Sequence, residues 1–260
     1  MTVRDALREA ERRLGAAGVD TPRVDAELLL AHVVGTTRSG LYSDLDREID
    51  GAVEPLLVRR EAREPLAYIL GEWGFRRLTL KTDARALVPR PETEIVVERC
   101  LALLDGTAAP RILDIGVGSG AIALSLKDER RDAHVVGVDV SLDALALARE
   151  NAQQLRLDVD LHEGDASAAR DGWDLVVSNP PYVDTLDGLQ PELRYEPEQA
   201  LLGGGLHEQI ARIAASRFLV FEVGAGQAHA IAGALGSCGY AEVTITADLA
   251  GIDRVVEGRR

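Results

Sequence analysis

The sequence predicts an α/β protein with a mostly parallel sheet that includes one antiparallel strand, preceded by a small all-α bundle and a β-hairpin linker. Residues 1–70 show helical spacing of apolar positions, residues 71–88 change to a period typical of strands, and from Pro89 onward strand-like runs alternate with helical segments. Such alternation favours parallel pairing through right-handed crossovers. We therefore expect a helical bundle over 1–70, a hairpin linker over 71–88 and an α/β domain over 89–260.

The composition fits a globular protein and narrows the classes of partner. Among 260 residues, 29 are basic and 43 acidic, which gives a formal net charge of −14 and argues against binding along a nucleic-acid backbone. The hydrophobic fraction of 46% is enough for a sizeable core. No apolar run approaches the about 18–20 residues of a membrane span, and residues 1–20 lack the pattern of a signal peptide. Cys100 and Cys238 have no metal-ligand spacing and cannot make a disulfide framework, which indicates a reducing cytoplasm.

The N-terminal bundle should consist of short helices joined by turns. Thr2 can cap the first helix, and Thr21-Pro22 can start the second. The apolar face of the first helix comprises Val3, Ala6, Leu7, Ala10 and Leu14. Further helical pieces are expected around Leu45–Val58 and Arg60–Leu70. With 10 basic against 13 acidic residues this bundle is nearly balanced in charge, whereas the remainder carries 19 against 30.

The hairpin and the strands of the sheet follow in order. Apolar residues alternate with polar ones and glycines over Trp73–Leu80, which predicts the hairpin. The strand-like runs after it are Arg111–Ile115, His134–Val138, Val159–His162, Trp173–Val177, Phe218–Val223, Glu242–Ala247 and Arg254–Glu257. Only Asp248–Asp253 separate the last two runs, too few residues for a crossover helix, so this pair must be antiparallel. This pattern is typical of the Rossmann-like class I S-adenosylmethionine-dependent methyltransferases.

A glycine-rich loop, Asp114-Ile115-Gly116-Val117-Gly118-Ser119-Gly120, lies between a predicted strand and a predicted helix. Glycines at alternate positions let the backbone turn sharply and lie against a ligand. The loop also fits the dinucleotide fingerprint G-x-G-x-x-A, with Asp139 about 20 residues further on. The carboxylate of Asp114 would repel a pyrophosphate but would suit a sulfonium cofactor with an ammonium group. The loop thus favours S-adenosylmethionine over a dinucleotide, and over a purely structural turn.

Two further acids follow predicted strands and are candidates for the same cofactor. Asp139 can accept hydrogen bonds from both hydroxyls of a ribose. The alternative interpretation of Asp139 is that it caps the next helix, although Ser141 can do that by itself. Asp165 can meet an adenine amino group, and a simple turn is an equally good interpretation of its spacing.

The strongest motif is Asn179-Pro180-Pro181-Tyr182, directly after the strand that begins at Trp173. Two prolines fix the backbone and remove two donors, which leaves a rigid acceptor surface. The side-chain oxygen of Asn179 and the carbonyl of Pro180 can both point at one planar –NH₂ group, on which the ring of Tyr182 can stack. The expected target is therefore an amide or an exocyclic amine nitrogen. A proline-rich turn without function is the alternative interpretation.

At these residues the chain resembles the release-factor glutamine methyltransferases, the HemK/PrmC family, along nearly its whole length. The matching stretches are Glu64–Gly71, Val88–Glu94, Ile112–Leu124, Val177–Asp184, Tyr195–Leu201 and Asp253–Val256. The resemblance implies an N-terminal domain that helps recognise the protein substrate. It also implies that the catalytic domain methylates the glutamine amide in the Gly-Gly-Gln loop of class I peptide chain release factors.

The resemblance also assigns roles to residues of this sequence. Asn179, Pro180 and Tyr182 are expected to be catalytic and, with Pro181, to bind the glutamine. The cofactor S-adenosyl-L-methionine is expected to contact Asp114, Gly116, Val117, Gly118, Ser119, Gly120, Asp139, Asp165, Ala166 and Asn179. Ala166 stands where the family usually has an aromatic residue, and about ten residues of the family's pattern are missing after Leu201.

The expected reaction is in-line displacement, in which the amide nitrogen attacks the sulfonium methyl group, S-adenosylhomocysteine leaves, and the nitrogen then loses one proton to water. Other acceptors remain open: a glutamine of a ribosomal protein, or an adenine amino group of nucleic acid held by the same loop on a flipped base. A non-catalytic cofactor-binding protein is the alternative of another class. We expect a cytoplasmic monomer whose partner is a release factor, with no membrane contact and no nucleic-acid partner.

The remaining polar features receive plain interpretations. The segment Pro89–Glu94 is a helix start with acids in its first turn, and by resemblance it lines the cofactor pocket. Glu222, at the end of the fifth strand, is interpreted as structural. The five histidines show no ligand spacing, so we expect no metal.

Overall fold

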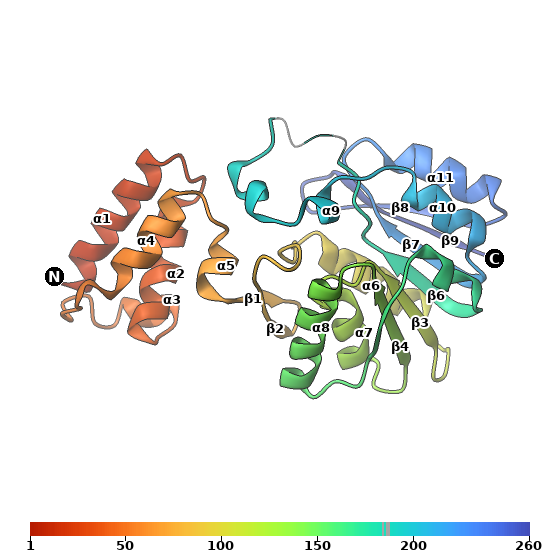
Figure 1. The fold of residues 1–260 in the computed structure, drawn as a ribbon, viewed down its shortest axis with the longest axis horizontal. Helices are drawn as coiled ribbons and strands as arrows, with labels where there is room; N and C mark the ends of the chain where they lie inside the picture. Colours follow the sequence, from red (N-terminus) through yellow and green to blue (C-terminus); the bar gives the residue numbers. More distant parts are fainter. Residues whose placement is uncertain (184, 186–187) are drawn as a thin grey trace. The chain divides into compact units, whose positions relative to one another are not determined.

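The computed structural model describes residues 1–183, 185 and 188–260 and divides the chain into two compact units (Figure 1). The first comprises Met1–Gly71 together with Gly188–Tyr195, and the second comprises Glu72–Asp187 and Glu196–Arg260. Sequence reasoning gave the segment Gly188–Tyr195 no place in the N-terminal unit.

The N-terminal unit is entirely helical in its described elements. These are α1 (Val3–Ala16), α2 (Pro22–Val34), α3 (Arg38–Leu41), η1 (Gly51–Val53), α4 (Glu54–Glu61), α5 (Leu66–Leu70) and η3 (Pro191–Tyr195). Thr2 caps α1 as predicted, because its hydroxyl accepts a hydrogen bond from the Asp5 N–H at 3.2 Å. The predicted apolar face of α1 is buried at all its positions.

The predicted boundaries of the later helices are wrong. Residues 45–50 form a turn and a short bridge of Glu48 to Thr2, and α4 runs through position 60, where the prediction placed a break. Pro55 lies in the first turn of α4, where its missing N–H costs nothing. Pro65 cannot continue a helix from the preceding turn, so it separates α4 from α5.

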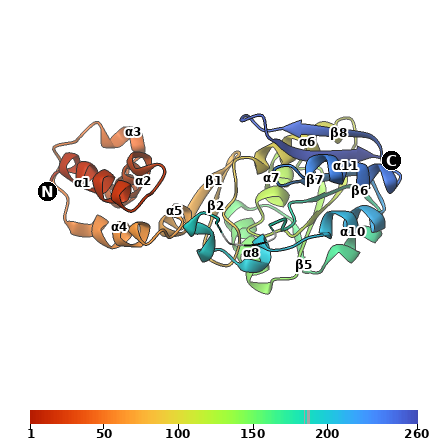
Figure 2. The ribbon, with the colours of Figure 1, turned by 90° about the horizontal axis from the view of Figure 1, so that it is seen from above.

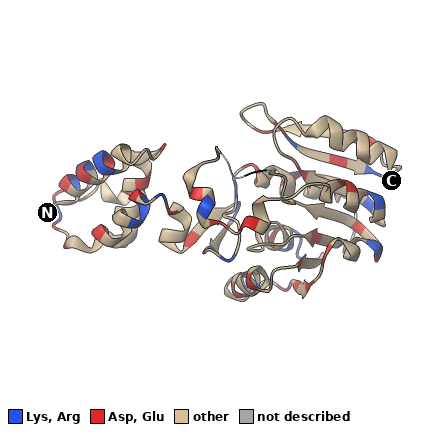
Figure 3. Ribbon diagram, turned by 45° about the horizontal axis from the view of Figure 1, so that its top comes forward, with Lys and Arg blue, Asp and Glu red and all other residues tan. Residues whose placement is uncertain are grey.

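A buried ion-pair network, which we call the Arg60 network, fastens Gly188–Tyr195 to the helices. The Arg60 guanidinium lies 2.7 Å from the Asp25 carboxylate of α2 and 2.9 Å from Glu192 of η3. Arg63 adds a second contact to Glu192 at 2.7 Å. Elsewhere on this unit, basic and acidic positions are interspersed along the helices (Figure 3).

The second unit is built on a seven-stranded sheet of order β5-β4-β3-β6-β7-β9-β8 (Figures 1 and 2). Its strands are β3 (Arg111–Ile115), β4 (His134–Asp139), β5 (Asp160–Glu163), β6 (Trp173–Ser178), β7 (Ser216–Glu222), β8 (Ala241–Ala247) and β9 (Asp253–Arg259). Strand β9 runs antiparallel to both its neighbours, and the other described pairs are parallel. The predicted fold class is confirmed. The predicted hairpin forms as β1 (Glu72–Phe75) and β2 (Leu78–Lys81).

Helices cover both faces of the sheet. The further elements are α6 (Thr93–Leu103), α7 (Ala121–Glu129), α8 (Leu142–Leu155), η2 (Ala166–Arg170), α9 (Glu198–Leu201), α10 (Leu206–Ile213) and α11 (Ala228–Ser237). One core joins α6, α7, α8 and the hairpin to the sheet, and a second core joins η2, α10 and α11 to the other face. No described helix has the length and apolarity of a membrane span.

The register brings the carboxyl ends of three strands to one edge of the sheet. Ile115 of β3 pairs with Val138 of β4 and with Ser178 of β6. The glycine loop, Asp139 and Asn179 are therefore neighbours in space. Ligands of parallel sheets bind outside the carboxyl ends of the strands, so this edge is the place to look for a site.

Candidate active site

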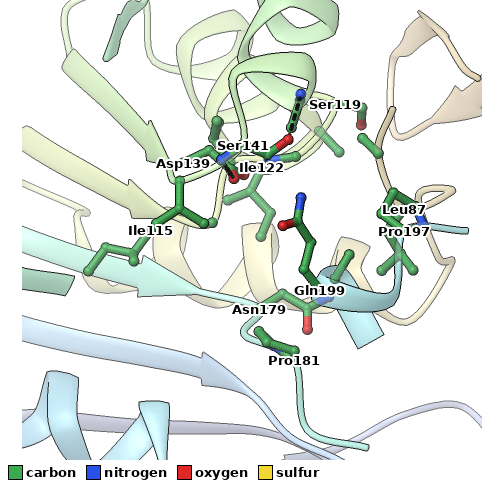
Figure 4. A pocket seen from close by; sticks show the side chains of 18 of the residues that line it. Leu87, Ile115, Ser119, Ile122, Asp139, Ser141, Asn179, Pro181, Pro197 and Gln199 are labelled. Carbon is green, nitrogen blue, oxygen red and sulfur yellow. Dashed lines mark hydrogen bonds between the residues drawn. The ribbon is translucent and has the colours of Figure 1, made fainter. Parts of the chain in front are cut away.

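A cavity of about 230 Å³ opens at this edge of the sheet, with side chains from the glycine loop, β4, the Asn-Pro-Pro-Tyr loop and α9 around it (Figure 4). The predicted site residues that line it are Gly116, Val117, Gly118, Ser119, Asp139, Asp165, Ala166, Asn179 and Pro181. Asp114, Gly120, Pro180 and Tyr182 lie outside the lining. Asp184, the last residue of a stretch matched above, lies outside the described residues.

The glycine loop has a backbone that only glycine adopts easily. Gly116, Gly118 and Gly120 have φ of 76°, 55° and 90°, all in the left-handed region. The N–H groups of Gly116 and Val117 both bond the carbonyl of Val138, at 2.8 and 3.0 Å, which holds the loop against the end of β4. The spacing of the glycines thus reflects three separate backbone requirements.

Asp139 supports the loop as well as lining the cavity. Its Oδ2 accepts a hydrogen bond from the Gly118 N–H at 2.9 Å, and its Oδ1 accepts one from the Ser141 N–H at 2.9 Å. Ser141 caps α8 by itself, since its hydroxyl accepts from the Ala144 N–H. The carboxylate keeps lone pairs for a further partner on each oxygen.

Asp139→Ala is expected to weaken cofactor binding by about 1–3 kcal/mol, because charge-assisted hydrogen bonds are lost. Calorimetry with S-adenosylhomocysteine measures the change. Asp143→Ala is the matched control, since Asp143 is an exposed acid in the first turn of α8 that does not line the cavity. Equal affinity for the wild type and Asp139→Ala would refute a role for Asp139 in holding the cofactor.

The other two predicted acids occupy different environments. Asp114 is buried beneath the loop, where its Oδ2 accepts from the Ala123 N–H at 3.1 Å and its Oδ1 has no partner among the described residues. Burial raises the pKa of Asp114 to about 7. Asp165 is exposed at the rim and caps η2, and hydrogen bonds from Ser167 lower its pKa.

Sequence reasoning missed two residues that support the loop from below. Gly137 of β4 lies directly under it, since a Cβ there would come within 2.7 Å of Val117 Cγ2. Asn151 of α8 is fully buried and donates to the carbonyl of Ser119 at 2.9 Å, while its Oδ1 accepts from the Lys81 N–H of the hairpin. Neither residue belongs to a recognisable motif, because each acts through a tertiary contact.

The Asn-Pro-Pro-Tyr loop packs closely against two glycines, at which there is no room for a Cβ atom. A Cβ on Gly203 would lie 2.8 Å from Pro181 Cγ, and a Cβ on Gly224 would lie 2.9 Å from Tyr182 Cδ2. Tyr182 is half-buried, and burial raises its pKa to about 12, with the nearby Glu222 carboxylate adding to the rise. The phenol therefore stays neutral throughout the physiological range.

Two segments far apart in the sequence are joined at the rim of the cavity. The buried carboxylate of Glu196 accepts from the Val88 N–H at 3.0 Å and from the Arg90 guanidinium. Val88, Arg90 and Pro197 all line the cavity, so this contact holds together two segments of its lining. The sequence indicated each segment separately but gave no sign that Glu196 connects them.

Behind Asn179 lies a short polar chain that ends on a buried acid. Thr93, the first residue of α6, lines the cavity and donates its hydroxyl hydrogen to Glu222 Oε2 at 2.6 Å. Asn179 Nδ2 lies 3.4 Å from the same Thr93 oxygen. Thr93 belongs to the segment 89–94, which was expected by resemblance to line the pocket, whereas Glu222 was interpreted as structural.

Two family models match the sequence. The PrmC N-terminal domain matches residues 5–71, and the methyltransferase small domain matches residues 93–205. Three similar proteins each bear the name Release factor glutamine methyltransferase. The protein of Deinococcus radiodurans is 41% identical, with 100% of this chain and 99% of its own length covered. The protein of Caulobacter vibrioides is 39% identical, with 99% of this chain and 96% of its own length covered. The protein of Vibrio cholerae is 38% identical, with 100% of this chain and 97% of its own length covered.

Solved structures of more distant proteins share the fold. A human methyltransferase 10 domain containing protein aligns with a TM-score of 0.54 and 16% identity, covering 69% of this chain and 87% of that one. The catalytic domain of hMettl16, solved in complex with MAT2A 3'UTR hairpin 6, aligns with a TM-score of 0.55 and 14% identity, covering 69% of this chain and 74% of that one. Both likenesses bear on the fold alone.

Proposed function

The chain belongs to the release factor glutamine methyltransferase family, and from that premise we propose that it transfers a methyl group from S-adenosylmethionine to the side-chain amide nitrogen of the Gly-Gly-Gln glutamine of class I peptide chain release factors. The observation that carries the proposal is that one cavity is lined by both the glycine loop and Asn179. One motif suits a sulfonium nucleoside and the other suits a carboxamide.

The residues present fit the cofactor. Gly116 lines the cavity, and a Cβ there would meet no atom within 4 Å, so the backbone is left bare beside open space. Asp139 and Asp165 supply acceptors for hydroxyl and amino hydrogens at the same wall. When bound, S-adenosylmethionine supplies an electrophilic methyl group.

The residues of the protein have to orient the substrate's amide nitrogen, which is a poor nucleophile. The lone pair of an amide nitrogen is delocalised into its carbonyl, so the nitrogen becomes reactive only when it is oriented and its developing positive charge is stabilised. The side-chain oxygen of Asn179, which lines the cavity, would accept one of its hydrogens, and the carbonyl oxygen of Pro180, just outside the lining, would accept the other. Holding the nitrogen in line supplies the rest through proximity.

We assign the domains their roles on the same premise. The helical bundle over residues 1–70 would help recognise the release factor, residues 71–88 would link it, and residues 89–260 would carry out methyl transfer. The reaction would take place in the cytoplasm, with the protein acting as a monomer. Asp114, which lies beneath the glycine loop, stays a predicted contributor to cofactor binding.

Label transfer tests the function directly. Incubation with S-adenosylmethionine labelled in its methyl group should label a class I release factor, but not the same factor with the Gly-Gly-Gln glutamine changed to glutamate. Ribosomal proteins and DNA in parallel reactions should remain unlabelled. Label on DNA would assign the loop to adenine, label on a ribosomal protein would move the acceptor, and no label anywhere would indicate a non-catalytic protein.

A further inference from the structure

Glu222 is a buried acid that the mechanism above does not use. It ends β7, only 2% of its surface is exposed, and it accepts the hydroxyl hydrogen of Thr93 at 2.6 Å. Asn179 reaches the same group from β6, with Nδ2 3.4 Å from Thr93 Oγ1 and a further hydrogen bond to Glu222 itself. Three elements therefore converge on the amide that faces the cavity.

The charge on Glu222 sets the direction of the hydrogen bonds in the network of Asn179, Thr93 and Glu222. An ionised carboxylate can only accept, so the single hydrogen of Thr93 is committed to it. Thr93 can then only accept from Asn179, which must turn its –NH₂ inward. The orientation of an asparagine amide follows from the network around it. With Nδ2 turned inward, Oδ1 is left for the cavity.

We propose that Glu222 is a positioning residue that, acting with Thr93, fixes the Asn179 amide with its oxygen toward the substrate. The inference rests on the proposed function, because it matters only if the substrate presents an –NH₂ group. The glutamine amide needs an acceptor from Asn179. An asparagine turned the other way would set two donors against each other and repel the substrate nitrogen.

Protonation of Glu222 would release this constraint. A carboxylic acid can donate to Thr93, whose hydroxyl hydrogen is then free to bond Asn179 Oδ1 and draw that oxygen inward. Burial raises the pKa of Glu222 to about 7, and hydrogen bonds from Thr93 and Asn179 offset part of the rise. Since the ionised form orients Asn179 correctly, methyl transfer should fall as the pH drops below about 7.

Several charged or titratable groups surround this acid and enter the pH dependence. Arg254 of β9 favours the ionised form, and Glu92 before α6 opposes it. The Tyr182 hydroxyl, with its raised pKa, stays neutral over the range in question. His207 of α10 bonds the main-chain carbonyl of Glu222 at 2.8 Å, and burial lowers its pKa, so it remains uncharged near neutral pH.

The test compares pH profiles of methyl transfer to a release factor at saturating cofactor, over about pH 5.5–9. The wild type should lose activity on the acid side with a midpoint near that of Glu222. Glu222→Gln should lower kcat about tenfold, because the amide can donate or accept and no longer dictates the orientation, and it should remove the acid limb. Thr93→Ser should keep the wild-type profile, and Thr93→Val should behave like Glu222→Gln.

Controls separate positioning from general damage. Cofactor affinity, measured by calorimetry, should be unchanged in all these variants. Glu257→Gln removes another buried acid of the sheet, one that accepts from Arg99 instead of from Thr93, and should retain the wild-type pH profile. Should Glu222→Gln fail to fold, the Thr93 pair still decides the question, since serine keeps the hydroxyl and valine keeps the shape.

Two failures are distinguishable. A wild-type protein that binds cofactor but labels no release factor refutes the proposed function. A wild type that methylates release factor, with an acid limb that persists in Glu222→Gln and Thr93→Val, refutes the positioning role and assigns the limb to another group such as Asp114. Loss of cofactor affinity in Thr93→Val would also overturn the proposal, because Thr93 would then act on the cofactor side of the cavity.

Discussion

Asn179→Ala should reduce the turnover of release factor methylation by about 100-fold or more, the loss expected when one preorganised polar contact to a reacting group is removed. The side chain lines the cavity, and its backbone is fixed by the prolines after it and by Ser178, whose hydroxyl donates to the Ile115 carbonyl at 2.7 Å. Truncation therefore removes the acceptor without moving the loop. Single-turnover methyl transfer at saturating cofactor measures the effect.

Cofactor affinity is the internal control for this variant. The glycine loop is held by hydrogen bonds to β4 and α8, which Asn179→Ala leaves in place, so calorimetry should show little change. Asn179→Asp asks a finer question, since a carboxylate still accepts but adds a charge that the closed site must desolvate. We expect it to be impaired. Near-normal methylation by Asn179→Ala would rule out the amide-holding mechanism.

Arg60→Ala should destabilise the N-terminal unit by about 3–5 kcal/mol, because it leaves the buried carboxylate of Asp25 without its cation. Arg60 is 6% exposed and Asp25 is 4% exposed, so water cannot hydrate the carboxylate of Asp25 once the guanidinium is removed. The same change frees Glu192 from one of its two arginines and loosens Gly188–Tyr195. Denaturant unfolding measures the loss of stability.

The two units should respond differently to this change. The cavity is lined entirely by residues of the second unit, so cofactor affinity should survive while methylation of intact release factor falls. Arg12→Ala is the control, because Arg12 pairs with Glu9 on the exposed surface of α1, where solvent screens the ion pair and its removal should leave the stability nearly unchanged. An Arg60→Ala protein as stable as Arg12→Ala would show that the Arg60 network contributes nothing.

The sequence by itself determined the features that depend on local chemistry. Gly116, Gly118 and Gly120 were predicted from their spacing, and each takes a backbone conformation that disfavours other residues. The antiparallel final pair followed from a connection too short for a crossover, and the structure confirms it. Thr2 and the apolar face of α1 were predictable for the same reason, because neighbours in sequence are neighbours in a helix.

Local reasoning failed where tertiary contacts outweigh it. The helical pieces around 45–70 were divided at the wrong residue, since the apolar pattern there is weak and the two prolines decide where helices begin. The membership of Gly188–Tyr195 in the N-terminal unit depends on Glu192 meeting Arg60 and Arg63. Glu192 and Arg63 are 129 positions apart, and no pattern in the sequence pairs them.

The candidate site also contains motifs that the sequence predicts and residues that only the fold brings to them. Its motifs were recognisable because a strand end followed by a glycine loop, or by Asn-Pro-Pro-Tyr, has a chemical meaning within a few residues. The groups that orient them were not, because Thr93 and Glu222 meet across 129 positions and Thr93 and Asn179 across 86. Glu222 was interpreted from the sequence as structural. Only the folded sheet, which brings the ends of β6 and β7 beside the start of α6, puts its carboxylate in contact with Thr93 and, through Thr93, with Asn179, and the positioning role is inferred from these contacts.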